Sequence, residues 1–275
     1  MTPFVGVSVS DALDSAVVAL QGAGVDSPRL DAEVLLAHVL GADRTALFTD
    51  PDRPIEGPEV HAFQAAVRRR WHDREPVAYI IGTKGFRHIE LNVDSRVLIP
   101  RPETEHVVEA ALALEHEARV VDVGTGSGAI ALALKQERPD LDIVATDISP
   151  EALELASANA VRLEIDVAFV EGDLLAGLRA DAIVSNPPYV EDRAALAPEI
   201  ARHEPALALF AGHDGLDAIR RLAPAAAASG AHWVALEVGD GQAAAVAALL
   251  MDAGYTQTRV DRDLAGIERV VVAWL

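Results

Sequence analysis

The sequence predicts an α/β protein, in which a mostly parallel sheet with helices on both faces follows a small helical region. Three observations lead to this prediction. Short apolar runs alternate with helical segments from residue 119 onward, helical periodicity dominates before residue 75, and a glycine-rich turn follows the first apolar run. Strands that alternate with helices form parallel sheets, because each crossover returns the chain to the same edge.

Composition narrows the class of protein. The 275 residues are 51% hydrophobic, enough for a sizeable core, and the net charge of −20 disfavours broad binding to nucleic-acid phosphates. The absence of cysteine excludes disulfides, zinc thiolates and thiol nucleophiles. No apolar span is long enough for a membrane helix, and residues 1–10 lack the pattern of a signal peptide. We therefore expect a cytoplasmic protein with no membrane partner.

Three helices are expected before residue 75. Ser10 is expected to cap the first, and Pro28 suits the first turn of the second. The third ends in a basic cluster. The cluster comprises Arg68, Arg69, Arg70, His72 and Arg74. Cations are favourable at a helix C-terminus, so we prefer a solvated helix end to a docking patch for an acidic or RNA-bearing partner.

The pattern changes between residues 78 and 104. Alternation over residues 89–93 predicts a strand, which we assign to a hairpin between two domains. Two prolines in residues 100–102 bracket an arginine, and Thr104 is then expected to cap a helix. Alone, this segment is a better candidate for a helix start than for a stiff loop at a pocket rim.

Seven strands are expected after residue 118, with helices between them. They cover residues 119–123, 143–146, 167–170, 181–185, 233–238, 256–260 and 268–274. Polar or glycine-rich segments follow the first four strands. They therefore lie at the carboxyl ends of the strands, which is the edge where open α/β sheets bind ligands.

The turn after the first of these strands suits a nucleoside-like ligand. Gly124, Gly126 and Gly128 allow positive φ and a close approach of the backbone to a ligand. Asp147, after the next strand, suits two ribose hydroxyls, and Asp173, after the third, suits an adenine amino group. The turn lacks a Walker lysine, and its Gly-x-Gly-x-Gly spacing differs from that of dinucleotide dehydrogenases. Each signal is weak alone, but three strand ends in order favour one cradle.

The fourth strand ends in Asn186-Pro187-Pro188-Tyr189. Two prolines donate no backbone N–H, so the strand must stop there. The resulting rigid turn carries an amide, carbonyl groups and an aromatic ring. By itself the triplet Asn-Pro-Pro is at least as often a simple strand-ending turn, and the glycine-rich turn upstream favours a site.

Together these motifs resemble the class I S-adenosylmethionine-dependent methyltransferases that act on amide or exocyclic amino nitrogens. More closely, the chain resembles the PrmC/HemK family of protein-(glutamine-N5) methyltransferases, which modify peptide chain release factors. Further matching motifs are Pro28-Arg29-Leu30-Asp31-Ala32-Glu33, Arg74-Glu75-Pro76, Ile99-Pro100-Arg101-Pro102-Glu103-Thr104-Glu105, Glu204-Pro205 and Asp214-Gly215-Leu216. The resemblance covers nearly the whole chain. It implies a Rossmann-like, mostly parallel seven-stranded sheet with a small N-terminal helical domain.

The resemblance also implies a domain plan and a set of roles. Residues 1–75 form a helical substrate-docking domain, 76–96 a β-hairpin linker and 97–275 the methyltransferase domain. S-adenosyl-L-methionine is bound by Gly124, Thr125, Gly126, Ser127, Gly128, Asp147, Asp173, Leu174 and Asn186. The substrate glutamine is bound by Asn186, Pro187, Pro188 and Tyr189. Leu174 stands where the family can place an aromatic residue, so adenine stacking is expected to be looser.

The implied catalytic residues are Asn186, Pro187 and Tyr189. The side-chain oxygen of Asn186 and the carbonyl of Pro187 accept the two amide hydrogens, and Tyr189 lies against the amide plane. A strong general base is not expected, because the amide proton becomes acidic only as the methyl group is transferred. No metal site is expected either. The expected partner is a class-1 peptide chain release factor, methylated at the glutamine of its Gly-Gly-Gln motif.

Three alternatives stay open. An adenine-N6 nucleic-acid methyltransferase would use the same tetrapeptide on a flipped base, but the acidic charge counts against direct nucleic-acid binding. A ribosomal-protein glutamine methyltransferase would look similar in sequence. A noncatalytic cofactor-binding protein would not need the full set of amide-binding groups.

Overall fold

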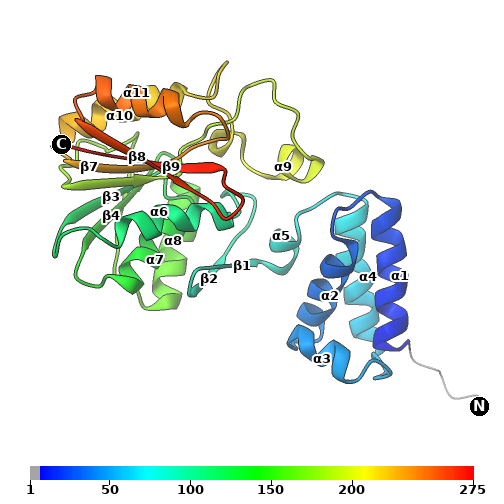
Figure 1. The fold of residues 1–275 in the computed structure, drawn as a ribbon. Coiled ribbons are helices and arrows are strands. Elements are labelled where there is room, and N and C mark those ends of the chain that lie inside the picture. Colours follow the sequence, from blue (N-terminus) through cyan, green and yellow to red (C-terminus); the bar gives the residue numbers. More distant parts are fainter. Residues whose placement is uncertain (1–6) are drawn as a thin grey trace, which may run out of the picture. The chain divides into compact units, whose positions relative to one another are not determined.

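The computed structural model describes residues 7–275, so most of the segment compared with a signal peptide lies outside the described residues (Figure 1). The chain divides into two compact units. The helical unit runs to Gly82 and takes in Leu196–His203, and the sheet unit comprises Thr83–Ala195 and Glu204–Leu275. The expected boundaries at residues 75 and 97 therefore differ from those of the structure.

The helical unit is built from five helices before Gly82 and one from the distant segment. They are α1 Val9–Gly22, α2 Pro28–Val39, α3 Arg44–Thr49, α4 Gly57–Trp71, α5 Val77–Ile81 and α9 Pro198–His203. Apolar residues of α1, α2 and α4, including Leu20, Leu35 and Phe63, form its core. Among the described residues, no helix of either unit is long and apolar enough to cross a bilayer.

Two details of the helical unit correct the sequence-based predictions. Ser8, not Ser10, caps α1, and its hydroxyl accepts the N–H of Asp11 at 3.1 Å. The segment 76–96, expected to form a β-hairpin linker, begins with helix α5. Its five residues are largely apolar after Pro76, and a helical turn lets Tyr79 and Ile80 be buried together.

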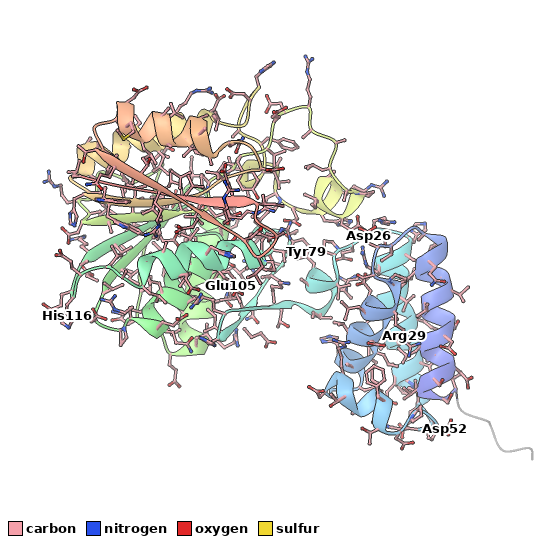
Figure 2. The ribbon with its side chains drawn as sticks, viewed as in Figure 1. Asp26, Arg29, Asp52, Tyr79, Glu105 and His116 are labelled. Carbon is pink, nitrogen blue, oxygen red and sulfur yellow. The ribbon has the colours of Figure 1, made fainter. Side chains whose placement is uncertain are left out.

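Ion pairs hold the helical unit together. Arg70 is buried, donates to Asp31 at 2.7 Å and pairs with Glu199 of α9 at 2.8 Å. Arg74 also pairs with Glu199, at 2.6 Å. Arg29, labelled on α2 in Figure 2, donates to the buried Glu33 at 2.7 Å. Much of the basic cluster predicted at the end of α4 is therefore internally paired, and it is not simply a solvated helix end.

The sheet unit contains a seven-stranded sheet in the order β5-β4-β3-β6-β7-β9-β8. Its strands are β3 Arg119–Val123, β4 Asp142–Asp147, β5 Ala168–Glu171, β6 Ala182–Ser185, β7 Trp233–Glu237, β8 Gln257–Arg262 and β9 Glu268–Trp274. The pairs from β5 to β7 are parallel, whereas β9 is antiparallel to both β7 and β8. The seven strands confirm the sequence-based prediction. The strand order reverses its direction between the neighbouring strands β3 and β6. In open α/β sheets ligands bind at such a switch point, so the carboxyl ends of these two strands are the expected ligand site.

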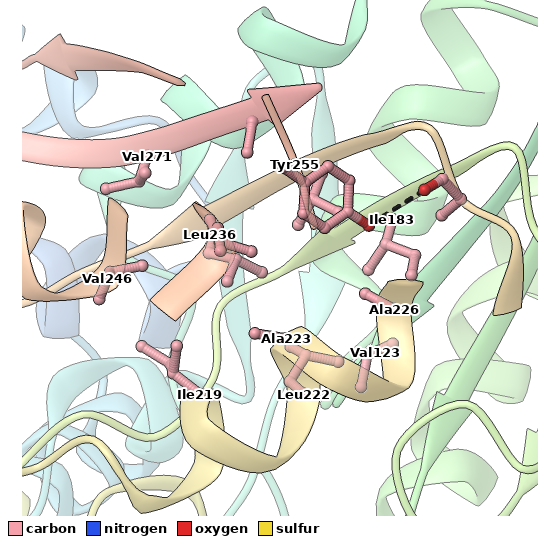
Figure 3. Close-up of a cluster of buried hydrophobic side chains, with 14 of the residues drawn as sticks. Val123, Ile183, Ile219, Leu222, Ala223, Ala226, Leu236, Val246, Tyr255 and Val271 are labelled. Carbon is pink, nitrogen blue, oxygen red and sulfur yellow. Dashed lines mark hydrogen bonds between the residues drawn. The ribbon is translucent and has the colours of Figure 1, made fainter. Parts of the chain in front are cut away.

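Helices cover the sheet and enclose an apolar core. They are α6 Glu105–Ala111, α7 Ala129–Glu137, α8 Pro150–Leu163, α10 Asp217–Ser229 and α11 Ala243–Asp252, with short 3₁₀ turns η1 Pro102–Thr104 and η2 Ala206–Ala208. Figure 3 shows the core between α10, α11 and the sheet, where Ile183 and Leu222 are buried. The hydroxyl of Tyr255 donates to the carbonyl of Ala231 at 3.1 Å, so this buried polar atom is satisfied.

The hairpin of β1 Thr83–Phe86 and β2 Ile89–Asn92 belongs to the sheet unit. Glu105, labelled at the start of α6 in Figure 2, accepts the N–H of Arg87 at 3.0 Å. Asn159 of α8 accepts the N–H of Asn92 at 2.8 Å and donates to its carbonyl at 3.0 Å. The predicted hairpin is confirmed, and it is packed onto the unit that carries the sheet.

Candidate functional site

The turn after β3 forms an open cradle. Gly124, Gly126 and Gly128 all have positive φ. A Cβ added at Gly124 or Gly126 would meet nothing within 4 Å, so the space above them is open. At Gly128 a Cβ would lie 2.8 Å from a terminal methyl group of Leu132, and the φ of 85° is the main reason that this position suits glycine.

Asp147, at the end of β4, is positioned by backbone groups. Its Oδ2 accepts the N–H of Gly126 at 2.9 Å, and its Oδ1 accepts the N–H of Ser149 at 2.9 Å. Each carboxylate oxygen has a second lone pair for a further donor. The aspartate therefore links the glycine turn to the start of α8 and can still accept hydroxyl groups.

Asp122 supports the cradle from below, a role that the sequence analysis did not assign. It is fully buried and accepts from the Thr125 hydroxyl at 2.6 Å and from the N–H of Ala131 at 3.2 Å. Its Oδ1 has no hydrogen-bond partner among the described residues. Burial raises the pKa of this carboxyl to about 7, although the Thr125 hydroxyl and the Ala131 amide act in the opposite direction. The sequence signal for this role was the position of Asp122 two residues before Gly124, at the start of the glycine-rich turn.

Asn186 follows β6, the strand beside β3. Its side-chain nitrogen donates to the Thr104 hydroxyl at 3.0 Å, which leaves Oδ1 as the acceptor. The hydroxyl of Thr104 does not cap α6 as predicted, because Thr104 is itself helical and its side chain binds Asn186 instead. The Pro-Arg-Pro-Glu-Thr segment is thus tied to the Asn-Pro-Pro-Tyr turn.

Tyr189 is held at both its backbone and its hydroxyl. Gln242 donates to its carbonyl at 3.1 Å, and a Cβ at Gly215 would collide with that same carbonyl oxygen. The Tyr189 hydroxyl donates to Oε1 of the buried Glu237 at 3.3 Å. Burial and the Glu237 carboxylate raise the pKa of Tyr189 above its usual value, so the phenol is protonated at neutral pH.

The proline-containing loop of residues 99–102 borders the site and is held by Glu204. Glu204 is buried, and its Oε1 accepts from the guanidinium of Arg101 at 2.6 Å. Its other oxygen accepts the N–H of Ile99 at 3.4 Å. The ion pair fixes the loop of residues 99–102 against residues 204–208, and both segments line one cavity.

This cavity, of about 260 Å³, brings most of the predicted site residues together. The predicted residues that line it are Gly124, Thr125, Gly126, Ser127, Asp147, Asp173, Leu174, Asn186, Pro187 and Pro188. Gly128 and Tyr189 are not among the lining residues. Apolar Leu98, Ile148 and Leu207 also line the cavity, and sequence reasoning did not select them. An isoleucine directly after the strand-end Asp147 was the available sequence signal, and the structure shows Ile148 to be exposed.

Two predicted residues have unexpected surroundings. Asp173 is exposed and forms an ion pair with Arg221 of α10, which also lines the cavity. Leu174 has a positive φ of 52°, and its carbonyl accepts from the Thr146 hydroxyl at 2.6 Å. A leucine in this conformation is strained, and the hydrogen bond helps to hold it at the cavity wall.

The sheet order, the cradle after β3 and the amide-bearing turn after β6 define a class I methyltransferase. Two family models match the chain, described as PrmC N-terminal domain (residues 11–82) and methyltransferase small domain (residues 88–205). A release factor glutamine methyltransferase of Koribacter versatilis is 44% identical over 97% of this chain and 98% of its own length. That of Deinococcus radiodurans is 45% identical over the same shares. The chain belongs to the release factor glutamine methyltransferase family.

Solved structures share the fold at low sequence identity. A methyltransferase from Pyrococcus furiosus is 17% identical, with a TM-score of 0.51 over 67% of this chain and 87% of its own. The hMettl16 catalytic domain in complex with the MAT2A 3′UTR hairpin 6 is 16% identical, with a TM-score of 0.52 over 80% of this chain and 82% of its own. These similarities concern the methyltransferase fold alone.

Proposed function

We propose that this chain transfers a methyl group from S-adenosylmethionine to the side-chain nitrogen (N5) of the glutamine in the Gly-Gly-Gln motif of class-1 peptide chain release factors. The observation that carries the proposal is the orientation of Asn186. Its nitrogen is engaged by Thr104, so Oδ1 is left as an acceptor in the cavity that also contains the glycine cradle. Family membership over nearly the full chain supports the choice of substrate.

The cavity fits the methyl donor. The open space above Gly124 and Gly126 admits close approach of a ligand, and Asp147 has lone pairs for ribose hydroxyls. We assign adenine to the neighbourhood of Asp173 and Leu174, with apolar contact from Ile148. When bound, S-adenosylmethionine supplies an electrophilic methyl group on a sulfonium.

The chain's own contribution is to orient a poor nucleophile. The nitrogen lone pair of a glutamine amide is delocalised into its carbonyl group. Oδ1 of Asn186 and the carbonyl of Pro187 accept the two N–H groups, which aligns the nitrogen and stabilises the positive charge that develops on it. No general base among the site residues is needed for this, because the proton is lost only after it has become acidic.

Tyr189 contributes through its position in the loop. Its ring was predicted to lie against the amide plane, and that contact stays a prediction, since Tyr189 does not line the cavity. Its hydroxyl is bound to Glu237 and its carbonyl to Gln242, so it holds the Asn-Pro-Pro segment in place.

We further propose that the helical unit docks the release factor away from the reacting loop. A glutamine loop offers little surface, and a second weak contact raises its effective concentration at the site. Release factors act in the cytoplasm, where we place the protein. The names of the relatives favour a release factor over a ribosomal protein as substrate. Adenine methylation finds no support beyond a shared fold.

The test is transfer of labelled methyl from S-adenosylmethionine to an intact release factor, with DNA and a ribosomal protein as competing acceptors. Asn186→Ala should lower kcat by about a hundredfold or more, while calorimetry shows S-adenosylmethionine still binding. Gln257→Ala, an exposed change on an outer strand, is the matched control. Near-normal turnover by Asn186→Ala would refute the role of Asn186. Transfer of the labelled methyl group to DNA and not to the release factor would refute the proposed substrate.

A further inference from the structure

Leu207 is an apolar residue that lines the cavity and is nevertheless exposed. It lies in the short turn η2, between Pro205 and Ala208, and all three residues line the cavity. Leu207 is 61% exposed, so it stands at the mouth of the cavity, where the site meets solvent. We call residues 205–208 the lip. Their side chains carry no hydrogen-bond donor or acceptor, so the lip can select a ligand by shape and apolar contact only.

The lip is anchored on both sides. Glu204, the residue directly before it, is buried and accepts from Arg101 at 2.6 Å. Beyond the lip, the chain pairs with the residue that follows the Asn-Pro-Pro-Tyr turn. The N–H of Val190 donates to the carbonyl of Leu209 at 2.9 Å, and the N–H of Ala211 donates to the carbonyl of Val190 at 2.9 Å. The lip is therefore fixed relative to that turn and cannot move outward without breaking these bonds.

The cavity has little room for a substrate chain. Its volume of about 260 Å³ lies below the roughly 300–1,000 Å³ of typical small-molecule sites. In the proposed function the cofactor occupies the part over the glycine cradle, so only one side chain of the substrate can reach Asn186 and Pro187. The residues next to that side chain stay at the mouth of the cavity, against the lip.

We propose that Leu207 is a specificity-determining residue, which packs against the backbone of the residue before the substrate glutamine and requires that residue to be glycine. The inference rests on the proposed function, in which the substrate is a Gly-Gly-Gln loop. A glycine backbone can approach the leucine side chain closely. A Cβ at the same place would meet a wall that is anchored on both sides, and such a clash excludes other sequences.

Paired substitutions in the full-length protein and its substrate test this contact. The substrates are an intact class-1 release factor and its variant with Gly-Ala-Gln in place of Gly-Gly-Gln. The wild type should prefer the natural factor by about thirtyfold in kcat/KM. Leu207→Ala should lower kcat/KM for the natural factor about fivefold, because an apolar contact is lost, and should reduce the preference to about threefold, because the added methyl group then finds space. The dissociation constant of S-adenosylmethionine should change less than about twofold.

Two further variants separate the contact from a general loss of structure. Leu207→Ile keeps the volume of the side chain and should keep the preference within about twofold of the wild type. Leu264→Ala removes a fully exposed leucine from the turn between β8 and β9, and should match the wild type on both substrates. An unchanged preference in Leu207→Ala would overturn the proposal, and so would a preference in Leu207→Ile as weak as that in Leu207→Ala.

A structural measurement shows whether Leu207 touches the substrate or only holds the lip. Hydrogen exchange at the amides of Val190 and Ala211, which anchor the lip, should be the same in Leu207→Ala as in the wild type. Faster exchange at these amides would make Leu207 a support of the lip and would overturn the proposal. Methylation of the natural factor with an unchanged preference in Leu207→Ala refutes this inference alone, whereas no methylation by the wild type refutes the proposed function and this inference with it.

Discussion

The two units bury carboxylates in different ways. In the helical unit, Asp31 is bound to Arg70 and Glu33 to two arginines. In the sheet unit, Asp122 and Glu237 are bound to hydroxyls, and each has one oxygen without a hydrogen-bond partner in the part of the chain that the structure describes. Burial also raises the pKa of Glu33, but its arginines outweigh this and hold the pKa below the usual value. The pKa values of Asp122 and Glu237 are raised to about 7.

The difference separates a structural use of charge from a functional one. A buried carboxylate between guanidinium groups is saturated and has one role, to hold its neighbours in place. A buried carboxylate among hydroxyls can direct hydrogen bonds and change its protonation state near neutral pH. Glu204 shows that the contrast follows the role and not the unit, because it lies in the sheet unit, pairs with Arg101 and fixes a loop.

The largest effect is expected in the helical unit. Arg70→Ala leaves Asp31 buried without its guanidinium and should lower the free energy of unfolding by about 3–5 kcal/mol. Chemical denaturation followed by circular dichroism measures this. Arg68→Ala, an exposed change on the same helix, should cost less than about 0.5 kcal/mol. Equal costs for the two variants would remove the contrast between the units.

Asp147 tests a carboxylate whose partners, within residues 7–275, are backbone N–H groups. Asp147→Ala should weaken binding of S-adenosylmethionine by about 1.5–3 kcal/mol, because two charge-assisted hydrogen bonds to the ribose are lost. Titration calorimetry on the folded variant gives the dissociation constant. An unchanged constant would contradict its role and leave Asp147 as a support of the glycine turn only.

Asp122 should make stability depend on pH. Its pKa is about 7 in the folded chain and near 3.8 without burial, so the folded state binds the proton more tightly. This contribution to stability is present at low pH and is lost as pH rises through 7. Between pH 6 and pH 8 the loss from Asp122 is about 1.4 kcal/mol, and Asp122→Asn should remove this share while the share from Glu237 remains. The exposed Asp166→Asn is the control. If the free energy of unfolding of Asp122→Asn depended on pH as steeply as that of the wild type, the raised pKa of Asp122 would be contradicted.

The smallest effect concerns docking by the helical unit. Because much of its basic cluster is internally paired, we expect the contact to use exposed Trp71, which borders a hollow lined by α1 and α9. Trp71→Ala should lower kcat/KM for an intact release factor about fivefold, on the order of 1 kcal/mol, and leave a glutamine-loop peptide unaffected. Phe48→Ala, an exposed aromatic on α3, is the matched control. Equal losses on factor and peptide would assign the unit a purely structural role.

Much of this fold follows from local patterns. The strands of the sheet were predicted within a residue or two, because buried parallel strands are short apolar runs with clear ends. The errors fell where several local structures satisfy the same pattern. Ser8 and Ser10 can both cap α1, and the apolar run from Val77 can form a helix or a strand. Helix α9 was not predicted, since six residues give too little periodicity.

The site divides in the same way. The glycine turn, Asp147 and Asn186 were identified because each carries its chemistry at a strand end. The contacts of Glu237 with Tyr189 and of Thr104 with Asn186 were not, because each joins side chains that lie 48 or 82 residues apart in the sequence. A buried glutamate at the end of a strand has no motif, and only its neighbours show what it does.

The segment between Tyr189 and Glu204 affects how the chain can be divided. The chain passes between the units three times, at residues 82–83, 195–196 and 203–204. Deleting everything before Thr83 would leave helix α9 behind, with Glu199 deprived of both arginines. A single proteolytic cut would not free either unit. The helical unit is therefore not a detachable module, and a gene fusion or loss at one point could neither have added it nor removed it intact.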